Sequence, residues 1–241
     1  MSFTRCRNNK GWSAPNPLIA REKCMKRFLT ILISMTLIGT LAACSQPASE
    51  SGDILPSHET LGAASGKAIV TFADPVLEAM VRASMGKPEG DITAAEAEAV
   101  TRLNLSIEWQ RYISEETSIK DIGGLENFTN LECLDLSFHA ITDITPLAGL
   151  KKLTSLSLSN NPVADISPLT GLAGLKVLIL TGCKAQDYAP LAKLVNLDFL
   201  MLDHATIADV SPLALLAELE LLYLADCPID DYSPLSDIYP N

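Results

Sequence analysis

The chain has 241 residues, of which 48% are hydrophobic and only 5% aromatic, so its core must consist mainly of aliphatic side chains. Its formal net charge is −11, and from Cys44 onward 11 basic residues stand against 28 acidic ones, a balance of 11 − 28 = −17. This acidic excess argues against nucleic acid as a partner, because phosphate binding needs a cationic face.

Residues 1–43 have the pattern of a secretory signal peptide. Lys26 and Arg27 precede an apolar run over residues 28–43, and the run ends in small residues. A chain that begins at Met25 would carry a signal of ordinary length, which makes residues 1–24 an over-long start. The alternative is an uncleaved membrane anchor, although the run is shorter than the roughly 20 residues that a spanning helix needs. Both interpretations predict an exported protein.

The letters LAAC, residues 41–44, resemble the bacterial lipobox. The resemblance implies that the Cys44 thiol receives a lipid, becomes the first mature residue and anchors the protein to a membrane. Residues 45–67 are rich in Ser, Gly, Pro and Ala and lack apolar periodicity, which predicts a flexible tether. Residues 44–67 thus form a lipidated cysteine and its linker.

Residues 68–99 have two helix-start signals, which predict a small helical N-terminal cap. Asp74 is placed to cap a helix that has Pro75 at its first position, and Gly86 is placed to end it. Thr93 and Glu96 have the spacing of a capping box. We expect these helices to cover the open end of the following array.

Residues 100–241 contain a repeat of 22 residues with the pattern L-x-x-L-x-L. Its leucines are Leu131, Leu134, Leu136, then Leu153, Leu156, Leu158, then Leu175, Leu178, Leu180, then Leu197, Leu200, Leu202, and Leu219, Leu222, Leu224. The pattern resembles the leucine-rich repeat. It predicts an α/β solenoid, a right-handed superhelix with a parallel β-sheet on its concave face and short 3-10 or extended segments on its convex side.

Each repeat continues with an aspartate and, three residues later, a proline. We expect Thr145 and the equivalent serines to cap a convex turn, with the proline at its first position. The aspartate column could be a calcium ladder or could accept backbone amides, and the lack of a glycine-rich calcium loop favours the amides. Cys183 and Cys227 lie two coils apart, about 10 Å, too far for a disulfide.

The phrase ITDITPLAGL at residues 141–150, the 22-residue period and the preceding helical segment resemble the internalin-type repeats of bacterial surface proteins. The resemblance covers roughly residues 70–241. It implies binding of a macromolecule without a catalytic centre. Internalins commonly continue into an immunoglobulin-like module and a wall-attachment tail, whereas this sequence stops at DIYPN, so lipid on Cys44 would replace that attachment.

Alternation along the strands predicts which side chains point away from the core. In the later repeats these form an apolar patch on the concave face, with Asp203 at its edge. The patch consists of Val177, Ile179, Phe199, Met201, Leu221 and Tyr223. It could bind a partner, or it could pack on a missing C-terminal module or a second copy.

Trp109 and Tyr112 form a second candidate contact, in a stretch with nine residues more than the period. Trp, Tyr and Arg are frequent at interface hot spots, but a tryptophan beside a cap can equally fill the cap's own core.

The mature sequence has three histidines, no metal-ligand spacing, no phosphate-binding loop and no nucleophile beside a base. We therefore expect no catalysis, metal or cofactor. The predicted function is a membrane-anchored lipoprotein of the bacterial cell surface that binds a protein or glycan through its concave face. The alternative is an envelope scaffold, or a truncated remnant, that forms homo-oligomers through an open C-terminal repeat, with fraying after Leu216.

Overall fold

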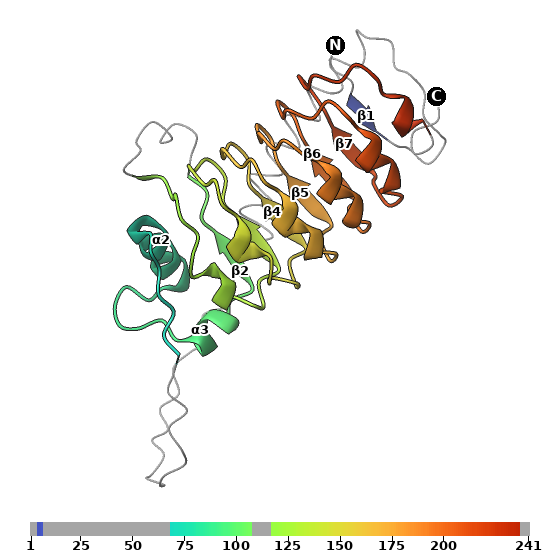
Figure 1. Cartoon of the computed structure of the whole chain (residues 1–241). Helices are drawn as coiled ribbons and strands as arrows, with labels where there is room; N and C mark the ends of the chain where they lie inside the picture. The colour runs from blue at the N-terminus through green and yellow to red at the C-terminus, as the bar shows by residue number, and fades with distance from the viewer. Residues whose placement is uncertain (1–3, 7–67, 108–116, 237–241) are drawn as a thin grey trace, which may run out of the picture. The chain divides into compact units, whose positions relative to one another are not determined.

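The computed structural model describes residues 4–6, 68–107 and 117–236, all within one compact unit of the chain. Short strands alternate with short 3-10 turns after two N-terminal helices (Figure 1). In chain order the elements are β1 (Thr4–Cys6), α2 (Pro75–Met85), α3 (Ala94–Glu98), β2 (Arg102–Asn104), η3 (Leu125–Asn127), β3 (Cys133–Asp135), η4 (Thr145–Leu147), β4 (Ser155–Ser157), η5 (Ser167–Gly171), β5 (Val177–Ile179), η6 (Ala189–Lys193), β6 (Phe199–Met201), η7 (Ser211–Leu215), β7 (Leu221–Tyr223) and η8 (Ser233–Leu235).

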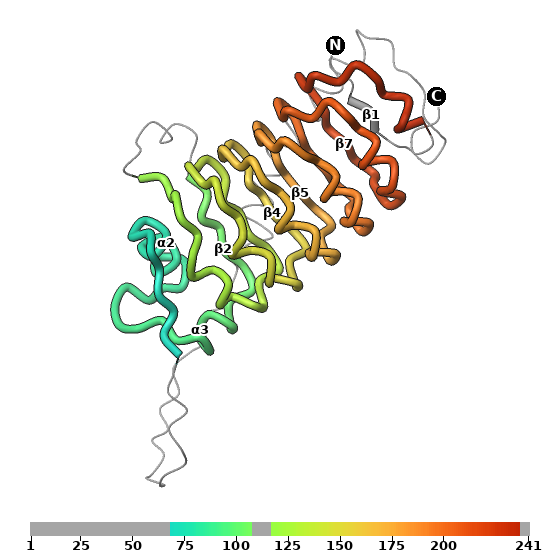
Figure 2. Tube along the Cα trace, viewed as in Figure 1, coloured from blue at the N-terminus to red at the C-terminus, as the bar shows by residue number. Residues whose placement is uncertain are grey.

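The strands β2 to β7 form a parallel sheet in chain order, which confirms the predicted solenoid. From β3 onward each residue pairs with the residue 22 positions later, so Leu134, Leu156 and Leu178 lie side by side. The successive coils can be followed in Figure 2. Because register and sequence period are equal, every position of the repeat becomes a column across the sheet.

The outer edge of β7 is paired, which corrects the expectation of an open edge in this chain. β1 lies antiparallel to β7, with Thr4 opposite Tyr223 and Cys6 opposite Leu221. Residues 4–6 precede Met25 and belong to the segment that we expect to be removed on export. The period could not reveal this pairing, since it lies outside the repeats.

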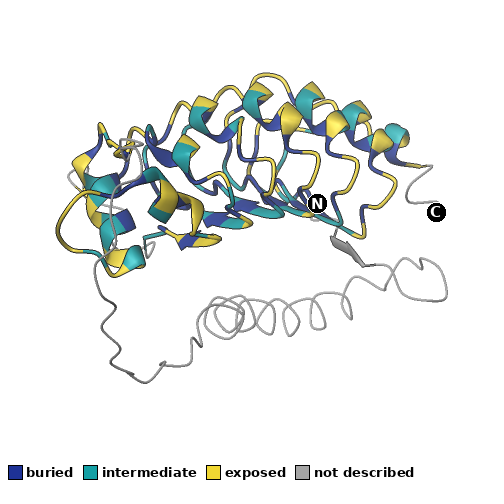
Figure 3. Ribbon diagram, turned by 90° about the horizontal axis from the view of Figure 1, so that it is seen from below, coloured by how far each residue is buried: buried dark blue, intermediate teal, exposed yellow. Residues whose placement is uncertain are grey.

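The repeated leucines form one continuous core between the sheet and the 3-10 turns (Figure 3). In each strand from β2 to β7 the middle residue is buried, and its two neighbours point to the opposite face of the sheet. Leu200 and Leu202 are 0% exposed, whereas Leu222 and Leu224 in the last coil are each 8% exposed. Burial is therefore less complete in the last described coil.

Asp74 joins the N-terminal cap to the first coil. Its Oδ1 accepts the backbone amides of Val76 and Leu77 at the start of α2, at 2.8 and 3.2 Å. Its Oδ2 accepts the amides of Lys120 and Asp121, at 2.7 and 3.2 Å. Burial opposes ionisation of this carboxyl, but the four amides outweigh that effect and lower the pKa of Asp74.

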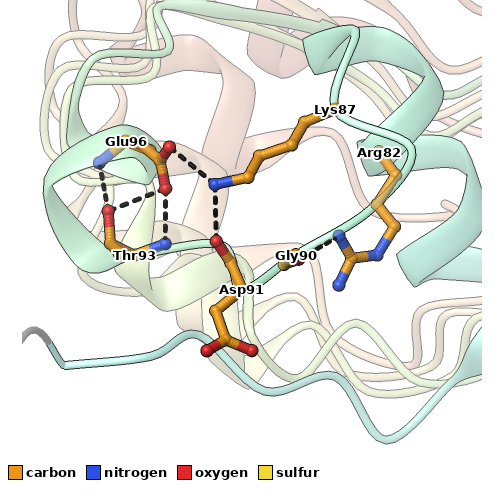
Figure 4. A network of polar contacts seen from close by, with 6 residues as sticks. All are labelled: Arg82, Lys87, Gly90, Asp91, Thr93 and Glu96. Atoms are coloured by element: carbon orange, nitrogen blue, oxygen red, sulfur yellow. Dashed lines mark hydrogen bonds and ion pairs between the residues drawn. The ribbon is translucent and has the colours of Figure 1, made fainter.

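The capping box at α3 forms as the sequence predicts. The Glu96 backbone amide donates to the Thr93 hydroxyl oxygen at 3.3 Å, and the Thr93 amide donates to the Glu96 carboxylate at 2.8 Å. Lys87 also donates to Glu96, at 2.6 Å (Figure 4). The Lys87 hydrogen bond is the largest cause that lowers the pKa of Glu96, to about 2. This network fastens α3 to the loop that follows α2.

The aspartate column caps the turns, which corrects the predicted role of the hydroxyl residues. Asp143 accepts the backbone amide of Thr145 at 2.8 Å, and the equivalent bond recurs in each later repeat. The 3-10 segments begin at Thr145 and its equivalents, with the proline second and no side-chain cap from a hydroxyl. Ala189 begins η6 without a hydroxyl, because Asp187 supplies the acceptor at 2.8 Å. The backbone-amide interpretation of the column is confirmed.

One inward position per repeat bonds the backbone between coils. Asn161 donates to the Leu136 carbonyl at 2.7 Å and accepts from the Ile141 amide at 3.1 Å. His139 fills the same position in the preceding coil: Nδ1 accepts from the Ile119 amide at 3.2 Å, and Nε2 lies 2.6 Å from the Leu105 carbonyl. Buried side chains thus satisfy backbone groups that the short strands leave unpaired.

In the later coils smaller side chains form the hydrogen bonds to the backbone. The Cys183 thiol donates to the Val163 carbonyl at 3.3 Å. Ala205 cannot form this bond, and the neighbouring Thr206 hydroxyl donates instead to the Ala185 carbonyl at 2.7 Å. Cys183 and Cys227 are both free thiols, as the distance argument predicts. Burial raises the pKa of the Cys183 thiol, which keeps it protonated.

We expect Asp74→Ala to lower the free energy of unfolding by about 2–3 kcal/mol, because four backbone N–H groups lose their acceptor. Asp74→Asn should cost roughly half as much, since its amide oxygen can still accept the α2 amides. Urea denaturation measures both effects, with Asp91→Ala as an exposed control. Equal stability of the alanine variant and the wild type would contradict the proposed clamp.

We expect His139 to make the protein less stable at acidic pH. His139 is fully buried, and burial is the largest cause that lowers its pKa below the ordinary value. The unfolded chain therefore binds a proton first, and stability falls as the pH drops through about 6.5 towards the lower pKa of the folded state, by at most about 1.4 kcal/mol per pH unit.

His139→Asn gives this coil the residue type that Asn161 provides at the equivalent position of the next coil. Because asparagine does not titrate, the substitution should remove this part of the pH dependence. Urea denaturation between about pH 7 and pH 5 measures it, around the ordinary histidine pKa. His204→Asn, at an exposed histidine, is the matched control for the loss of one imidazole. Parallel stability curves for wild type and His139→Asn would refute the expectation.

Candidate functional surface

The predicted apolar residues gather on the open face of the sheet, the face that points away from the leucine core. They form two columns over three adjacent strands: Val177, Phe199 and Leu221 in one, and Ile179, Met201 and Tyr223 in the other. We call these six residues the apolar patch. The fixed register of β5 to β7 holds the columns about 4.8 Å apart from strand to strand.

The apolar patch is less exposed than predicted. Ile179 and Tyr223 are buried at 8% and 7% exposure, and the other four side chains are half-buried. The Phe199 and Tyr223 rings pack at a centroid distance of 5.5 Å, and β1 lies beside β7 opposite Tyr223. The contact between the Phe199 and Tyr223 rings reduces the exposure of both side chains, a packing effect that alternation alone does not predict.

The earlier repeats make the other half of the open face polar. Asp135 Oδ1 accepts the Ser137 amide at 2.9 Å and lies 2.6 Å from the Ser137 hydroxyl, which donates to it. The Ser137 and Ser157 hydroxyl oxygens lie 2.7 Å apart, and those of Ser157 and Ser159 3.3 Å apart. The sequence identifies these residues as small and polar, but it does not predict that they form one network.

Asp203 lies beside the apolar patch, as predicted, and is half-buried. It accepts the Ala225 amide at 2.7 Å. Burial is the largest cause that raises the pKa of Asp203, against the opposing effect of that amide. His204 Nδ1 lies 3.5 Å from Asp226 Oδ2, and both of these side chains are exposed. The Asp203 carboxylate and the contact between His204 and Asp226 thus lie beside the apolar patch.

Thr181 occupies the equivalent position between Ser159 and Asp203. Its hydroxyl oxygen is buried and has no hydrogen-bond partner in the described part of the chain. Buried hydroxyls are normally paired, so this group needs an explanation. Threonine is an ordinary residue at this position, so no pattern in the sequence predicts the missing partner.

A left-handed residue follows each strand from β3 to β7 and turns the chain at the end of the open face. Phe138, Asn160, His204 and Asp226 have φ between 55° and 66°, and Gly182 has φ 71°. This column was missed, although four of its five residues are Asn, Gly, His or Asp, types that tolerate this conformation. The 22-residue spacing of these residues could have been used to predict the column.

The other predicted sites lie outside the described residues. These are the lipidation site Cys44 and the candidate contacts Trp109 and Tyr112. Over residues 68–107 and 117–236 no group of His, Cys, Asp or Glu side chains is arranged to hold a metal ion. In the same described ranges, no helix combines the length and apolar character needed to cross a membrane.

The comparisons with known proteins agree with this architecture. Residues 151–193 match the family model for leucine-rich repeats in two copies. No curated protein sequence matches the chain. An internalin (InlF) from Listeria monocytogenes is 30% identical with a TM-score of 0.58, over 73% of this chain and 57% of that one. The chain therefore spans less than two thirds of that relative.

Two further solved structures come from the same organism. Internalin C2 is 30% identical with a TM-score of 0.52, over 69% of this chain and 80% of that one. The functional domain of InlJ, described as including a cysteine ladder, is 20% identical with a TM-score of 0.50 over 66% of this chain and 38% of that one, and it shows the shared fold alone. The 22-residue coils and the similarity over most of internalin C2 show that this chain belongs to the internalin-type leucine-rich repeat proteins.

Proposed function

We propose that this protein is a lipid-anchored bacterial cell-surface protein that binds a protein or glycan partner through the open face of its sheet, without catalysis. The observation that carries the proposal is the apolar patch, six side chains held in register on β5 to β7 on the face that the core does not use. The leucine-rich repeat architecture of the chain suggests a protein-binding role.

Physical reasoning about parallel sheets supports a binding role for this face. Such sheets are normally covered on both sides, because their strands are apolar on both faces. Here the leucine core covers one side, and the second side becomes apolar only over β5 to β7. Localised apolar surface bordered by polar groups is typical of partner sites.

The double substitution Phe199→Ser and Tyr223→Ser should reduce partner binding at least tenfold, because aromatic residues at the centre of an interface contribute most of the binding energy. The full chain and the variant are immobilised and compared for recovery of the same species from extracts of cell-surface proteins and glycans. Circular dichroism and thermal unfolding confirm that the variant is folded.

Val195→Ser with Leu215→Ser is the matched control. Both residues are exposed, at 48% and 64%, and belong to the turn side of the coils. This variant removes apolar surface away from the open face and should bind as the wild type does. Equal binding by the open-face variant would contradict the proposed function.

For the anchor, we expect Cys44 to incorporate a labelled fatty acid in a bacterial host and to hold the protein in the membrane fraction. Cys44→Ser should abolish the label, because only the thiol accepts the lipid, while Cys133→Ser, at a free cysteine of the sheet, should retain it. An unlabelled wild-type chain would refute lipid anchoring. Labelling would not by itself identify a partner.

An envelope scaffold is the second candidate function, and the β1 pairing favours it. Removal of residues 1–43 would take β1 away from β7 and leave an unpaired strand edge beside leucines that are already 8% exposed. Such edges pair with other chains. Light scattering on the processed protein separates the two functions: a defined dimer favours the scaffold, and a monomer favours partner binding through the open face.

A further inference from the structure

A row of polar side chains runs along the open face beside the apolar patch. Ser137, Ser159, Thr181 and Asp203 occupy the same position in four successive coils, two residues after the third residue of each strand. We call these four residues the polar row. With about 4.8 Å between strands, the row extends over about 14 Å.

The hydrogen bonds at the first end of the row have a fixed direction. The Ser137 hydroxyl donates to Asp135 at 2.6 Å, so its single proton is used. At 2.7 Å the Ser157 hydroxyl must then donate to Ser137, and at 3.3 Å Ser159 donates to Ser157. All three protons point towards the carboxylate, so this end presents oxygen lone pairs and negative charge.

Asp203 gives the other end of the row the same character. It is half-buried, and no ion pair in the described part of the chain joins it to a lysine or arginine. A carboxylate removed from water is costly unless a positive charge or several donors compensate for it. The Ala225 amide supplies one donor, at 2.7 Å.

Thr181 lies between these two ends, next to the apolar residues of β5. Its buried hydroxyl oxygen has no partner among the described residues. The row therefore contains a polar group that still needs a hydrogen bond, and it lies between Asp135 and Asp203, which form no ion pair with a lysine or arginine of the described residues. All three features favour a ligand that brings hydrogen-bond donors and positive charge.

We propose that the open face recognises a polypeptide segment in which apolar side chains cover the apolar patch and adjacent lysine or arginine side chains bond to Asp203 and Asp135 along the polar row. This inference rests on the proposed function and specifies the chemistry of the partner. The net charge of −17 from Cys44 onward favours the approach of such a segment.

The dimensions favour a polypeptide over a neutral glycan. A strand rises about 3.3 Å per residue, so four to five residues cover the row, and alternate side chains reach a surface whose columns repeat at about 4.8 Å. A neutral sugar would supply hydroxyl groups but no charge for the half-buried carboxylate, and most of the apolar patch would remain without apolar contacts.

Three fluorescein-labelled ten-residue peptides test the proposal, each with a central run of Leu and Phe flanked by Lys, by Gln or by Glu. Fluorescence anisotropy with the full chain should show the Lys peptide binding at least tenfold more tightly than the Glu peptide. Asp135→Asn with Asp203→Asn should weaken the Lys peptide about tenfold and affect the Gln peptide little, because only charge pairing is lost.

Asp187→Asn with Asp209→Asn is the matched control. It removes the same two charges at exposed aspartates that cap the turns, so it separates a local effect from the overall acidity of the protein. It should bind the Lys peptide as the wild type does. Raising the salt concentration from about 0.05 M to about 0.5 M should weaken the wild type more than the Asp135 and Asp203 variant.

The outcomes separate the two proposals. Equal binding of all three peptides, no binding of any, an equal effect of both double variants, or saturable binding of a neutral glycan array instead would overturn the basic-peptide proposal. If the open-face aromatic variant still loses its surface partner in those cases, the proposed function remains supported. If it does not, both proposals fail.

Discussion

Each coil presents leucines that only the adjacent coils can cover, and this stacking requirement determines the rest of the structure. A three-residue strand is too short to be stable alone, so Leu156 is buried only because Leu134 and Leu178 lie on either side of it. The stacking sets the 22-residue register. The register in turn places every non-leucine position in a column, so the open face follows directly from the way the core is packed.

The side chains that hydrogen-bond to the backbone differ from coil to coil, whereas the leucines of the L-x-x-L-x-L pattern recur in every repeat. One inward slot contains His139, Asn161, Cys183, Ala205 and Cys227 in successive coils. Where Ala205 has no polar group, Thr206 makes the equivalent bond to the carbonyl of Ala185. An aspartate supplies the acceptor at the start of each turn from η4 to η8, whereas several kinds of side chain supply the donor at the inner bend of a coil. The repeat therefore tolerates variation without losing its register.

The period and the alternation of side chains were enough to predict the sheet, the turns and the position of Phe199 on the open face. They were not enough for properties that depend on the distances between side chains. Ile179 and Tyr223 are buried although alternation places them on the open face, and β1 pairs with β7 outside any repeat. The aspartates, not the hydroxyls, cap the turns, because each aspartate lies two residues before the turn and its carboxylate accepts the first amide of the turn. The Thr181 hydroxyl lacks a hydrogen-bond partner among the described residues, and this property depends on distances that the repeat pattern does not contain.

The two halves of the open face have different physical roles in any interaction. The serines near Asp135 already bond to one another, so a partner gains little by replacing those bonds. The apolar patch gains from every contact that removes water. Binding energy should therefore come from β5 to β7, while Asp203 and Asp135, near the two ends of the polar row, select basic side chains in the partner. A surface with one apolar half and one self-satisfied polar half thus favours a single direction for an extended partner.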